Sequence, residues 1–205
     1  MSLYDDEYYI VHNMEGDDHI FLNATKNTAS RKYGYVKNDR ISEPFFFYND
    51  NKSSSLKYGD VDIMLDGVDM VVSDRVREII SAETVKGLQF NSAVFIDEDD
   101  KWHEGLWYLT FYERLACLDV KDSEALRGDL SAYGPKSIMT VNKYSLDAKK
   151  LDSIPLDERL IFKIGGTSFS YVFVHESIRD AIISSGIRGV RFFKVSEFEE
   201  GDQYY

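Results

Sequence analysis

The stretch VSDRVREIISAETVKGLQF at residues 72–90 decides the fold, because the chain repeats it as VHESIRDAIISSGIRGVRF at residues 174–192. The two stretches align without a gap at a constant offset of 102 residues. Five aligned pairs are identical: Val72/Val174, Arg77/Arg179, Ile80/Ile182, Gly87/Gly189 and Phe90/Phe192. A repeat of this kind indicates that one structural unit occurs twice in the chain.

Each copy has the pattern of a strand, a short helix and a second strand. In the first copy Ser73 suits the helix N-cap, and Asp74 favours the positive end of the helix dipole. Apolar side chains then follow the i, i+3, i+4 spacing that places them on one helix face, against a sheet. They are Val76, Ile79 and Ile80 in the first copy and Ile178, Ala181 and Ile182 in the second. We expect the helices to end near Thr84 and near Gly186, and the shared glycine to turn each chain into the second strand.

The paired arginines, Arg77 and Arg179, are the matched position that a function could use. As equivalent ligand clamps, they would hold one ligand in each copy. Each arginine also lies beside the apolar face of its helix, where its aliphatic stem can simply cover the core. Every matched position is explained by capping, packing or turning, so the repeat predicts architecture rather than chemistry.

A long hairpin with an acidic tip is expected between the two copies. Its arms are residues 93–96 and 106–118, and its tip is DEDDKWHE, residues 97–104. In the second arm Trp107, Leu109 and Phe111 alternate with Tyr108, Thr110 and Tyr112. Large side chains therefore face both ways, which predicts a sheet that is covered in part on both sides.

These patterns predict an α+β fold with mixed, largely antiparallel sheets, a few short helices and an internally duplicated β-α-β unit. We expect residues 1–205 to form a single domain, because a chain of this size can bury one sizeable core. The alternative is a boundary near 124–136, where Gly128, Gly134 and Pro135 interrupt the pattern.

Three segments outside this frame are polar. Residues 23–43 and 49–55 read as loops because apolar side chains are sparse there. The end, residues 197–205, is acidic and is expected to fray.

The formal net charge is −12, from 36 acidic and 24 basic residues. Such a chain repels phosphate backbones and anionic lipids, so nucleic-acid and membrane partners are not expected. It attracts basic proteins, although an acidic surface can also serve solubility alone. No apolar run approaches the roughly 20 residues of a membrane helix, and Asp5, Asp6 and Glu7 stand where an export signal would carry Lys or Arg. With Cys117 as the single cysteine, a disulfide within the chain is excluded, and the cytoplasm is the expected compartment.

Few residues in the sequence suit a catalytic or metal-binding role. The clusters Asp17-Asp18-His19 and His103-Glu104 contain metal-ligand types, but both fit solvated turns, and the tip lacks the spacing of a calcium loop. His175 replaces Ser73 before the second helix, where it can act as a general base or cap the helix, and we expect the cap. No metal, cofactor or catalytic residue is expected.

For two further motifs, a structural interpretation is favoured over a catalytic one. Cys117 lies among apolar neighbours, which predicts a buried and unreactive thiol. Gly165-Gly166-Thr167 lacks the lysine and the spaced glycine of a phosphate-binding loop, and is expected to form a turn.

Three pieces of the sequence carry a resemblance to a known family. They are Cys117-Leu118-Asp119 with Ser123, the segment Ile161-Phe162-Lys163-Ile164-Gly165, and the stretch from Phe173 through Gly189-Val190-Arg191-Phe192. In these pieces the chain resembles the family-eleven immunity proteins of bacterial polymorphic toxin systems, formerly a domain of unknown function. The resemblance covers roughly residues 70–195 and leaves the N-terminal third unassigned.

The resemblance implies a cytoplasmic protein that neutralises a toxin domain by stoichiometric binding, with no cofactor and no catalytic residues. A basic nuclease is one kind of toxin that would suit the acidic composition. The candidate partner-binding residues are Asp99, Asp100, Trp102 and Glu104, because a Trp flanked by acids suits a binding hot spot. A regulatory adaptor and, less favoured, a small hydrolase remain the alternatives, and the sequence leaves the oligomeric state open.

Overall fold

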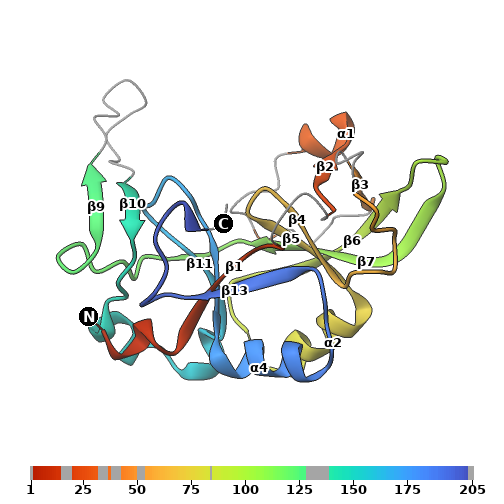
Figure 1. Cartoon of the computed structure of the whole chain (residues 1–205). Coiled ribbons are helices and arrows are strands. Elements are labelled where there is room, and N and C mark those ends of the chain that lie inside the picture. Colours follow the sequence, from red (N-terminus) through yellow and green to blue (C-terminus); the bar gives the residue numbers. More distant parts are fainter. Residues whose placement is uncertain are drawn as a thin grey trace.

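The computed structural model describes residues 2–14, 20–31, 37, 43–49, 54–83, 85–127 and 139–202. Its helices are short and its strands dominate (Figure 1). The helices are α1 (Lys26–Ala29), α2 (Asp74–Ser81), α3 (Ala148–Asp152) and α4 (Glu176–Ser184), with 3-10 turns η1 (Leu3–Asp5) and η3 (Leu156–Glu158). None of these described helices has the length and apolar character that a bilayer crossing demands.

The strands form three sheets. The open sheet has the order β13 (Val190–Lys194), β1 (Tyr8–Asn13), β12 (Val172–His175), β11 (Ile161–Ile164) and β8 (Arg114–Leu115). The barrel sheet has the order β2 (Leu22–Ala24), β3 (Phe45–Asn49), β6 (Leu88–Ile96), β7 (Trp102–Phe111), β5 (Asp69–Ser73) and β4 (Ile63–Asp66). A separate pair joins β9 (Glu124–Arg127) and β10 (Met139–Lys143).

The barrel sheet is nearly closed, because a parallel bridge between Phe21 and Leu65 connects its two outer strands. Strand pairs β3/β6 and β8/β11 are parallel and the other described pairs are antiparallel. The prediction of an α+β fold with mixed, largely antiparallel sheets and short helices is therefore confirmed.

Three apolar cores separate the layers. The central core lies between the two large sheets and under α2 and α4; the barrel core lies inside the barrel sheet; the third lies on the other face of the open sheet. Neighbouring side chains of one strand enter different cores: Leu109 and Phe111 enter the central core, whereas Tyr108 enters the barrel core. The prediction of a sheet covered on both sides is confirmed for β7.

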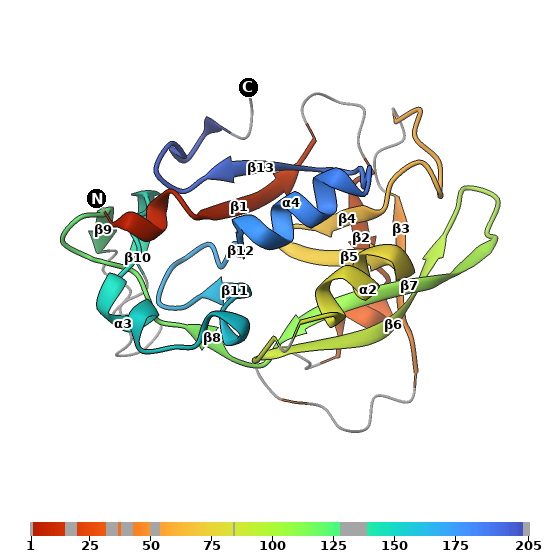
Figure 2. The same cartoon turned by 90° about the horizontal axis from the view of Figure 1, so that it is seen from below.

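Helices α2 and α4 lie side by side and cover the central core (Figure 2). Each helix buries two of its three predicted apolar positions, Val76 and Ile80 on α2 and Ile178 and Ile182 on α4. The third positions, Ile79 and Ala181, are half-buried. The C-terminus of α4 lies near Gly186, as the sequence predicts, and Gly186 adopts a left-handed φ of 67°.

The two predicted strand-helix-strand segments have neighbouring strands in equivalent positions. In each, an antiparallel strand is inserted between the segment's own two strands: β7 lies between β5 and β6, and β1 lies between β12 and β13. In each, a further antiparallel strand flanks the first one, β4 beside β5 and β11 beside β12. The inserted strand follows its unit directly in one case and comes from the N-terminus of the chain in the other.

The N-cap of α2 departs from the expectation. Ser73 occupies the N-cap position but makes no side-chain cap hydrogen bond. Its hydroxyl instead donates to Asp62 Oδ1 at 3.0 Å, because the start of β4 lies beside the start of the helix. A contact that is distant in sequence therefore replaces the local cap.

The hairpin boundaries also differ from the prediction. The ladder pairs Phe95 with His103 and Ile96 with Trp102, so the turn is only residues 97–101, and residues 102–104 belong to β7. The second arm ends at Phe111, and the chain then leaves for β8 in the open sheet. Residues 102–104 are strand because backbone pairing continues beyond the apolar positions that the sequence reading used.

Two of the predicted irregular segments contain structure. β2 and α1 lie within residues 23–43 or at their start, although 32–36 and 38–42 lie outside the described residues. At the C-terminal end Phe198 is buried, and the Glu200 N–H donates to the Asn142 carbonyl at 2.8 Å. Residues 197–202 are thus packed on β10 rather than frayed, because Phe198 completes the third core. Of the proposed boundary, 124–127 form β9 and the remainder lies outside the described residues.

Candidate partner-binding surface

The β6–β7 hairpin ends in a turn that the carboxylate of Asp97 organises. Asp97 Oδ1 accepts from the backbone N–H of Asp99 at 3.0 Å and of Lys101 at 2.9 Å. Asp100 has a φ of 60°, a left-handed conformation that Asp tolerates better than most residues. The result is a hydrogen-bonded turn that projects from the barrel sheet (Figure 1).

All four candidate residues are exposed at this end of the hairpin. Asp99 and Asp100 lie in the turn, and Trp102 and Glu104 are two residues apart on β7, which places them on one face of the strand. Trp102 is 61% exposed, although its ring lies 5.0 Å from the ring of Phe46 on β3. The structure therefore brings the predicted residues to one projecting end.

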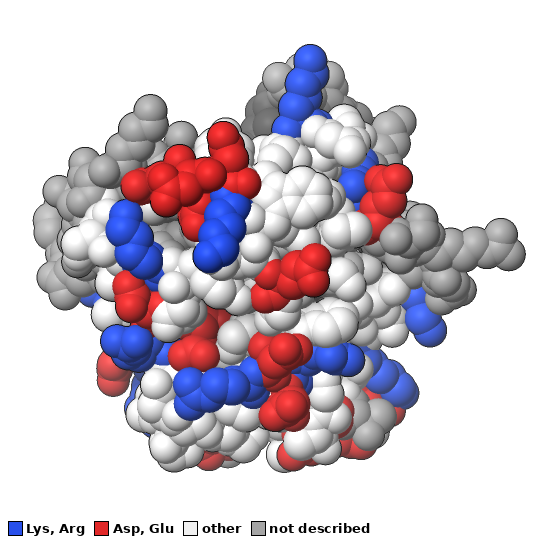
Figure 3. All heavy atoms as spheres, turned by 90° about the vertical axis from the view of Figure 1, so that its right-hand side faces the viewer, with Lys and Arg blue, Asp and Glu red and all other residues white. Residues whose placement is uncertain are grey.

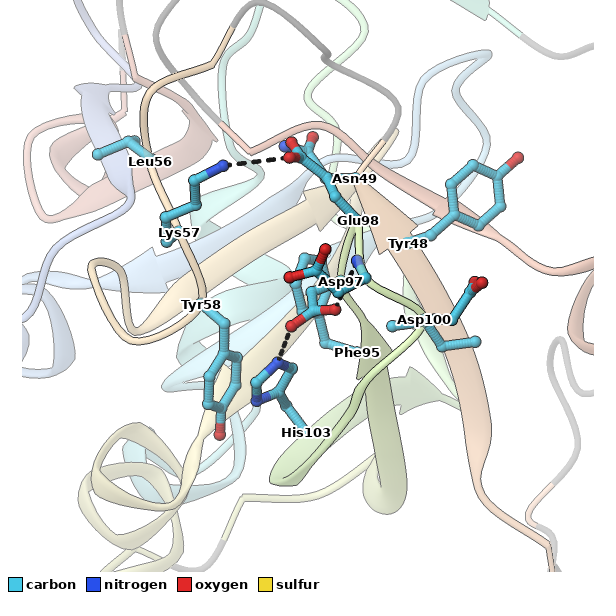
Figure 4. A pocket seen from close by; sticks show the side chains of 12 residues that line it. Tyr48, Asn49, Leu56, Lys57, Tyr58, Phe95, Asp97, Glu98, Asp100 and His103 are labelled. Carbon is cyan, nitrogen blue, oxygen red and sulfur yellow. Dashed lines mark hydrogen bonds and ion pairs between the residues drawn. The ribbon is translucent and has the colours of Figure 1, made fainter.

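A cavity of about 830 Å³ opens beside this turn, between the segment 56–58 and the hairpin (Figure 4). The rings of Tyr58 and His103 stack with their centroids 4.2 Å apart, and Phe95 lies 6.0 Å from Tyr58. The Tyr58 hydroxyl donates to the Glu104 carbonyl at 2.8 Å, which fixes the ring. The cavity thus has an aromatic floor.

Asp97 and His103 form a close pair inside the cavity. Asp97 Oδ2 lies 2.6 Å from His103 Nε2, and the hydrogen bond from His103, aided by the backbone donors of the turn, lowers the pKa of Asp97. Since an ionised carboxylate only accepts, His103 Nε2 carries the proton. The described residues that line the cavity include no Ser, Thr or Cys for this pair to activate.

The sequence analysis missed the other wall of the cavity. Lys57 and Tyr58 come from the segment before β4, about 40 residues away, and Lys57 Nζ lies 3.3 Å from Glu98 Oε2. Neither residue belongs to a motif, and a single Tyr after a polar stretch is no signal for a site. Only the near closure of the barrel sheet brings this segment to the hairpin.

Charge on this side of the molecule is divided rather than continuous. Figure 3 shows several separate groups of Asp and Glu side chains with Lys and Arg between them. A net charge of −12 therefore does not produce one acidic face here. The acids of the hairpin turn, residues 97–100, are a local concentration.

The paired arginines stack on rings, an outcome that the sequence did not anticipate. Arg77 Cζ lies 3.7 Å from the ring centroid of Trp107, and Arg179 Cζ lies 4.2 Å from that of Tyr9. Both rings belong to the strand that is inserted into the arginine's own unit. The geometry favours a structural role over the ligand clamp.

The remaining candidates lie away from the hairpin and away from one another. His175 Nδ1 accepts from the Ser177 N–H at 3.2 Å, which confirms the helix cap, and burial lowers the pKa of His175. Its Nε2 is 3.9 Å from Glu7, beyond hydrogen-bond reach. Burial raises the pKa of Cys117 to about 12, as expected for an unreactive thiol.

The glycine motif forms the predicted turn between β11 and β12. Gly166 has a φ of 84°, and the Gly165 N–H donates to the Leu115 carbonyl at 2.9 Å. The cluster at 17–19 lies outside the described residues. Within the described part of the chain, no three His, Cys, Asp or Glu residues are grouped so as to hold a metal ion.

Comparison with known families identifies the class of protein as an immunity protein. The family whose model matches is the immunity protein family Imm11, and the match covers residues 3–197, so the chain belongs to this family. The resemblance found in three short motifs is confirmed, and it extends into the N-terminal third that those motifs left unassigned. A search of curated proteins finds no significant match.

Proposed function

We propose that this protein is a cytoplasmic immunity protein that binds a cognate toxin domain and neutralises it stoichiometrically. The observation that carries the proposal is the family match over residues 3–197. Strands β4, β5, β11 and β12 bury side chains in cores on both faces, which suits a rigid scaffold that presents a surface rather than a mobile catalytic loop. A basic toxin, such as a nuclease, would be attracted by the net charge of −12.

We place the toxin contact at the tip of the β6–β7 hairpin, on Asp99, Asp100, Trp102 and Glu104. An exposed Trp contributes a large apolar area on binding, and hot spots are enriched in this residue. Its ring is already held against Phe46, so less conformational entropy is lost when a partner covers it. The surrounding acids favour partners with basic side chains.

The test combines binding with protection. The tagged protein is used to capture the product of the gene adjacent to its own, and survival is measured when that product is induced. We expect a stoichiometric complex and rescue of growth. A harmless neighbour that forms no complex would contradict the proposal and favour the regulatory adaptor.

A matched pair of double variants tests the contact surface. Trp102→Ala with Asp100→Asn, in which asparagine keeps the left-handed conformation at position 100, should weaken toxin binding at least tenfold with little change in the melting temperature, because truncating a hot spot costs more than about 1.4 kcal/mol. The control, Leu156→Ala with Asp157→Asn, removes an exposed apolar residue and an exposed acid in η3, and should bind as the wild type does. Equal affinities of the two double variants would remove the hairpin from the interface.

We further infer that residues 1–205 form a single domain that arose by internal duplication. Three correspondences support the duplication. The pairings Val72 with Trp107 and Val174 with Tyr9 occupy equivalent places, and each paired arginine stacks on the ring opposite the shared valine. The backbone bonds Ser73 N–H to Asp62 O and His175 N–H to Leu160 O, both 2.8 Å, are also equivalent. The shared central core supports one domain.

A further inference from the structure

Part of the cavity beside the hairpin turn has the features of a subsite for a single side chain. The whole cavity has a volume of about 830 Å³, so one side chain would occupy only the part beside the rings. Its floor is formed by the stacked rings of Tyr58 and His103 together with Phe95. Planar rings fixed in place can receive a flat group at low entropic cost.

The charge of the lining is strongly one-sided. Four successive carboxylates, Asp97, Glu98, Asp99 and Asp100, line the cavity. Among the described lining residues, Lys57 is the only lysine or arginine. In Figure 4 the Asp97 carboxylate lies at the edge of the His103 ring, to which it is hydrogen-bonded, and Glu98 reaches toward Lys57. Carboxylates beside aromatic rings form a setting that favours a cation.

Lys57 occupies part of this setting only loosely. Its Nζ lies 3.3 Å from Glu98 Oε2, and the two side chains are 66% and 65% exposed. Ion pairs this exposed contribute little to stability, so an incoming cation can displace the lysine from Glu98. The chain thus holds its own weak competitor for the position.

We propose that this cavity is a subsite for an arginine side chain of a basic protein partner, the toxin of the proposed function. A guanidinium can lie flat on an aromatic ring while its N–H groups bond to a carboxylate in a bidentate manner, which an ammonium cannot do. The chain itself places arginines over rings elsewhere: Arg77 on Trp107, Arg179 on Tyr9 and Arg159 on Tyr4. Arg179 also bonds to the carboxylate of Asp180. The inference rests on the proposed function for the identity of the partner but not for the chemistry of the subsite.

The test uses three capped tripeptides, Gly-Arg-Gly, Gly-Lys-Gly and Gly-citrulline-Gly, because citrulline has the shape of arginine without its charge. The ring signals of His103 and Tyr58 are followed by NMR as each peptide is added to the full chain. We expect saturable shifts with the arginine peptide, weaker binding of the lysine peptide and none of the citrulline peptide. Equal effects of the arginine and lysine peptides, or no saturable shift with arginine, would overturn the proposal.

Matched variants separate the subsite from general charge. Glu98→Gln should weaken binding of the arginine peptide at least threefold, whereas Asp157→Asn, which removes an exposed acid in η3 away from the cavity, should leave it unchanged. Lys57→Gln should strengthen it, because the internal competitor is gone. Equal losses in Glu98→Gln and Asp157→Asn would mean attraction by net charge alone and would refute the subsite.

The two proposals can fail separately. If the chain captures its toxin and protects cells but shows no arginine-specific shift, the subsite fails and the immunity function stands. If the arginine peptide binds with the expected variant pattern but no neighbour toxin is bound or neutralised, the proposed function fails and the subsite stands for another basic partner.

Discussion

The two strand-helix-strand units, β5-α2-β6 and β12-α4-β13, are alike where they pack and different where they end. Both place an arginine over the ring of an inserted strand, and both bury two helix side chains in the central core. The first unit, however, continues along β6 to Ile96 and returns as β7 from Trp102, whereas β13 stops at Lys194. The projecting end that we propose for binding exists on one unit alone.

This difference indicates how a repeated scaffold acquires a specific surface. The helix, the shared valine and the arginine serve the common core, so they can be the same in both units. The hairpin turn and the segment 56–58 lie outside that common core, although Leu56 and Tyr58 pack against the barrel core. Their exposed side chains can therefore differ from the other unit and serve a partner. Substitutions at equivalent positions of the two units can therefore test what each unit contributes.

The largest effect is expected at the shared glycine. A Cβ on Gly189 would lie 2.0 Å from the Ile63 carbonyl oxygen at a φ of 120°, whereas on Gly87 the nearest atom is Glu113 Cβ at 3.1 Å. We expect Gly189→Ala to lower the free energy of unfolding by about 3–4 kcal/mol and Gly87→Ala by about 1 kcal/mol, measured by urea unfolding.

Gly59→Ala measures the cost of the left-handed backbone conformation without a steric clash, because Gly59 has a φ of 93° and no atom lies within 4 Å of an added Cβ. It should match Gly87→Ala more closely than Gly189→Ala. If Gly189→Ala cost no more than the other two variants, the close approach of the two sheets at Ile63 would not limit this position. Should the variant be too unstable to purify, a lower soluble yield than for Gly87→Ala records the same order.

An intermediate effect is expected where β11, which flanks the second unit, meets β5 of the first unit. Lys163 is buried and pairs with Asp69, and burial, with the nearby Asp69 carboxylate, raises the pKa of Asp66 to about 6. The folded chain therefore holds this proton more tightly than the unfolded chain, whose aspartates titrate near 4, so stability falls as the pH rises from about 4 to about 6. Asp66→Asn should flatten that part of the profile and stabilise the protein at pH 7 by on the order of 1 kcal/mol.

Asp69→Asn is the matched control, because it leaves Lys163 buried without its ion-pair partner. It should destabilise the protein at pH 7, the opposite direction from Asp66→Asn. Both profiles are measured by urea unfolding between pH 4 and pH 8. An unchanged slope in Asp66→Asn would show that another group dominates the pH dependence.

The smallest effect is expected at the paired arginines. Arg77→Ala and Arg179→Ala each remove a guanidinium from a ring face and should cost about 0.5–1 kcal/mol. Lysine at either position should restore only part of the loss, because an ammonium does not stack as a guanidinium does. Arg77→Ala should also change the emission of Trp107, whereas Arg179→Ala should not. If either variant changed toxin binding without changing stability, the hypothesis that the paired arginines clamp a ligand would be supported instead.

Much of the fold could be predicted because the relevant signals are local. The apolar spacing of Val76 and Ile80 places both on one helix face whatever surrounds the helix, and Gly186 ends α4 because few other residues adopt its φ readily. The insertion of β1 could not be predicted: nothing in Tyr8–Asn13 indicates that it enters a unit formed by residues more than 150 positions later. Backbone pairing does not depend on how far apart two strands lie in the sequence, because every strand offers the same backbone donors and acceptors.

The candidate site divides in the same way. The sequence by itself determined an acidic, aromatic tip on a hairpin, since Asp99, Asp100 and Trp102 are adjacent in the chain and must be adjacent in space. It also determined the family, because that depends on residue identities alone. Only the tertiary structure decided that Tyr58 stacks on His103 and that Lys57 reaches Glu98. The cavity exists because the nearly closed barrel sheet brings a distant segment against the hairpin, and that closure depends on the packing of all its strands together.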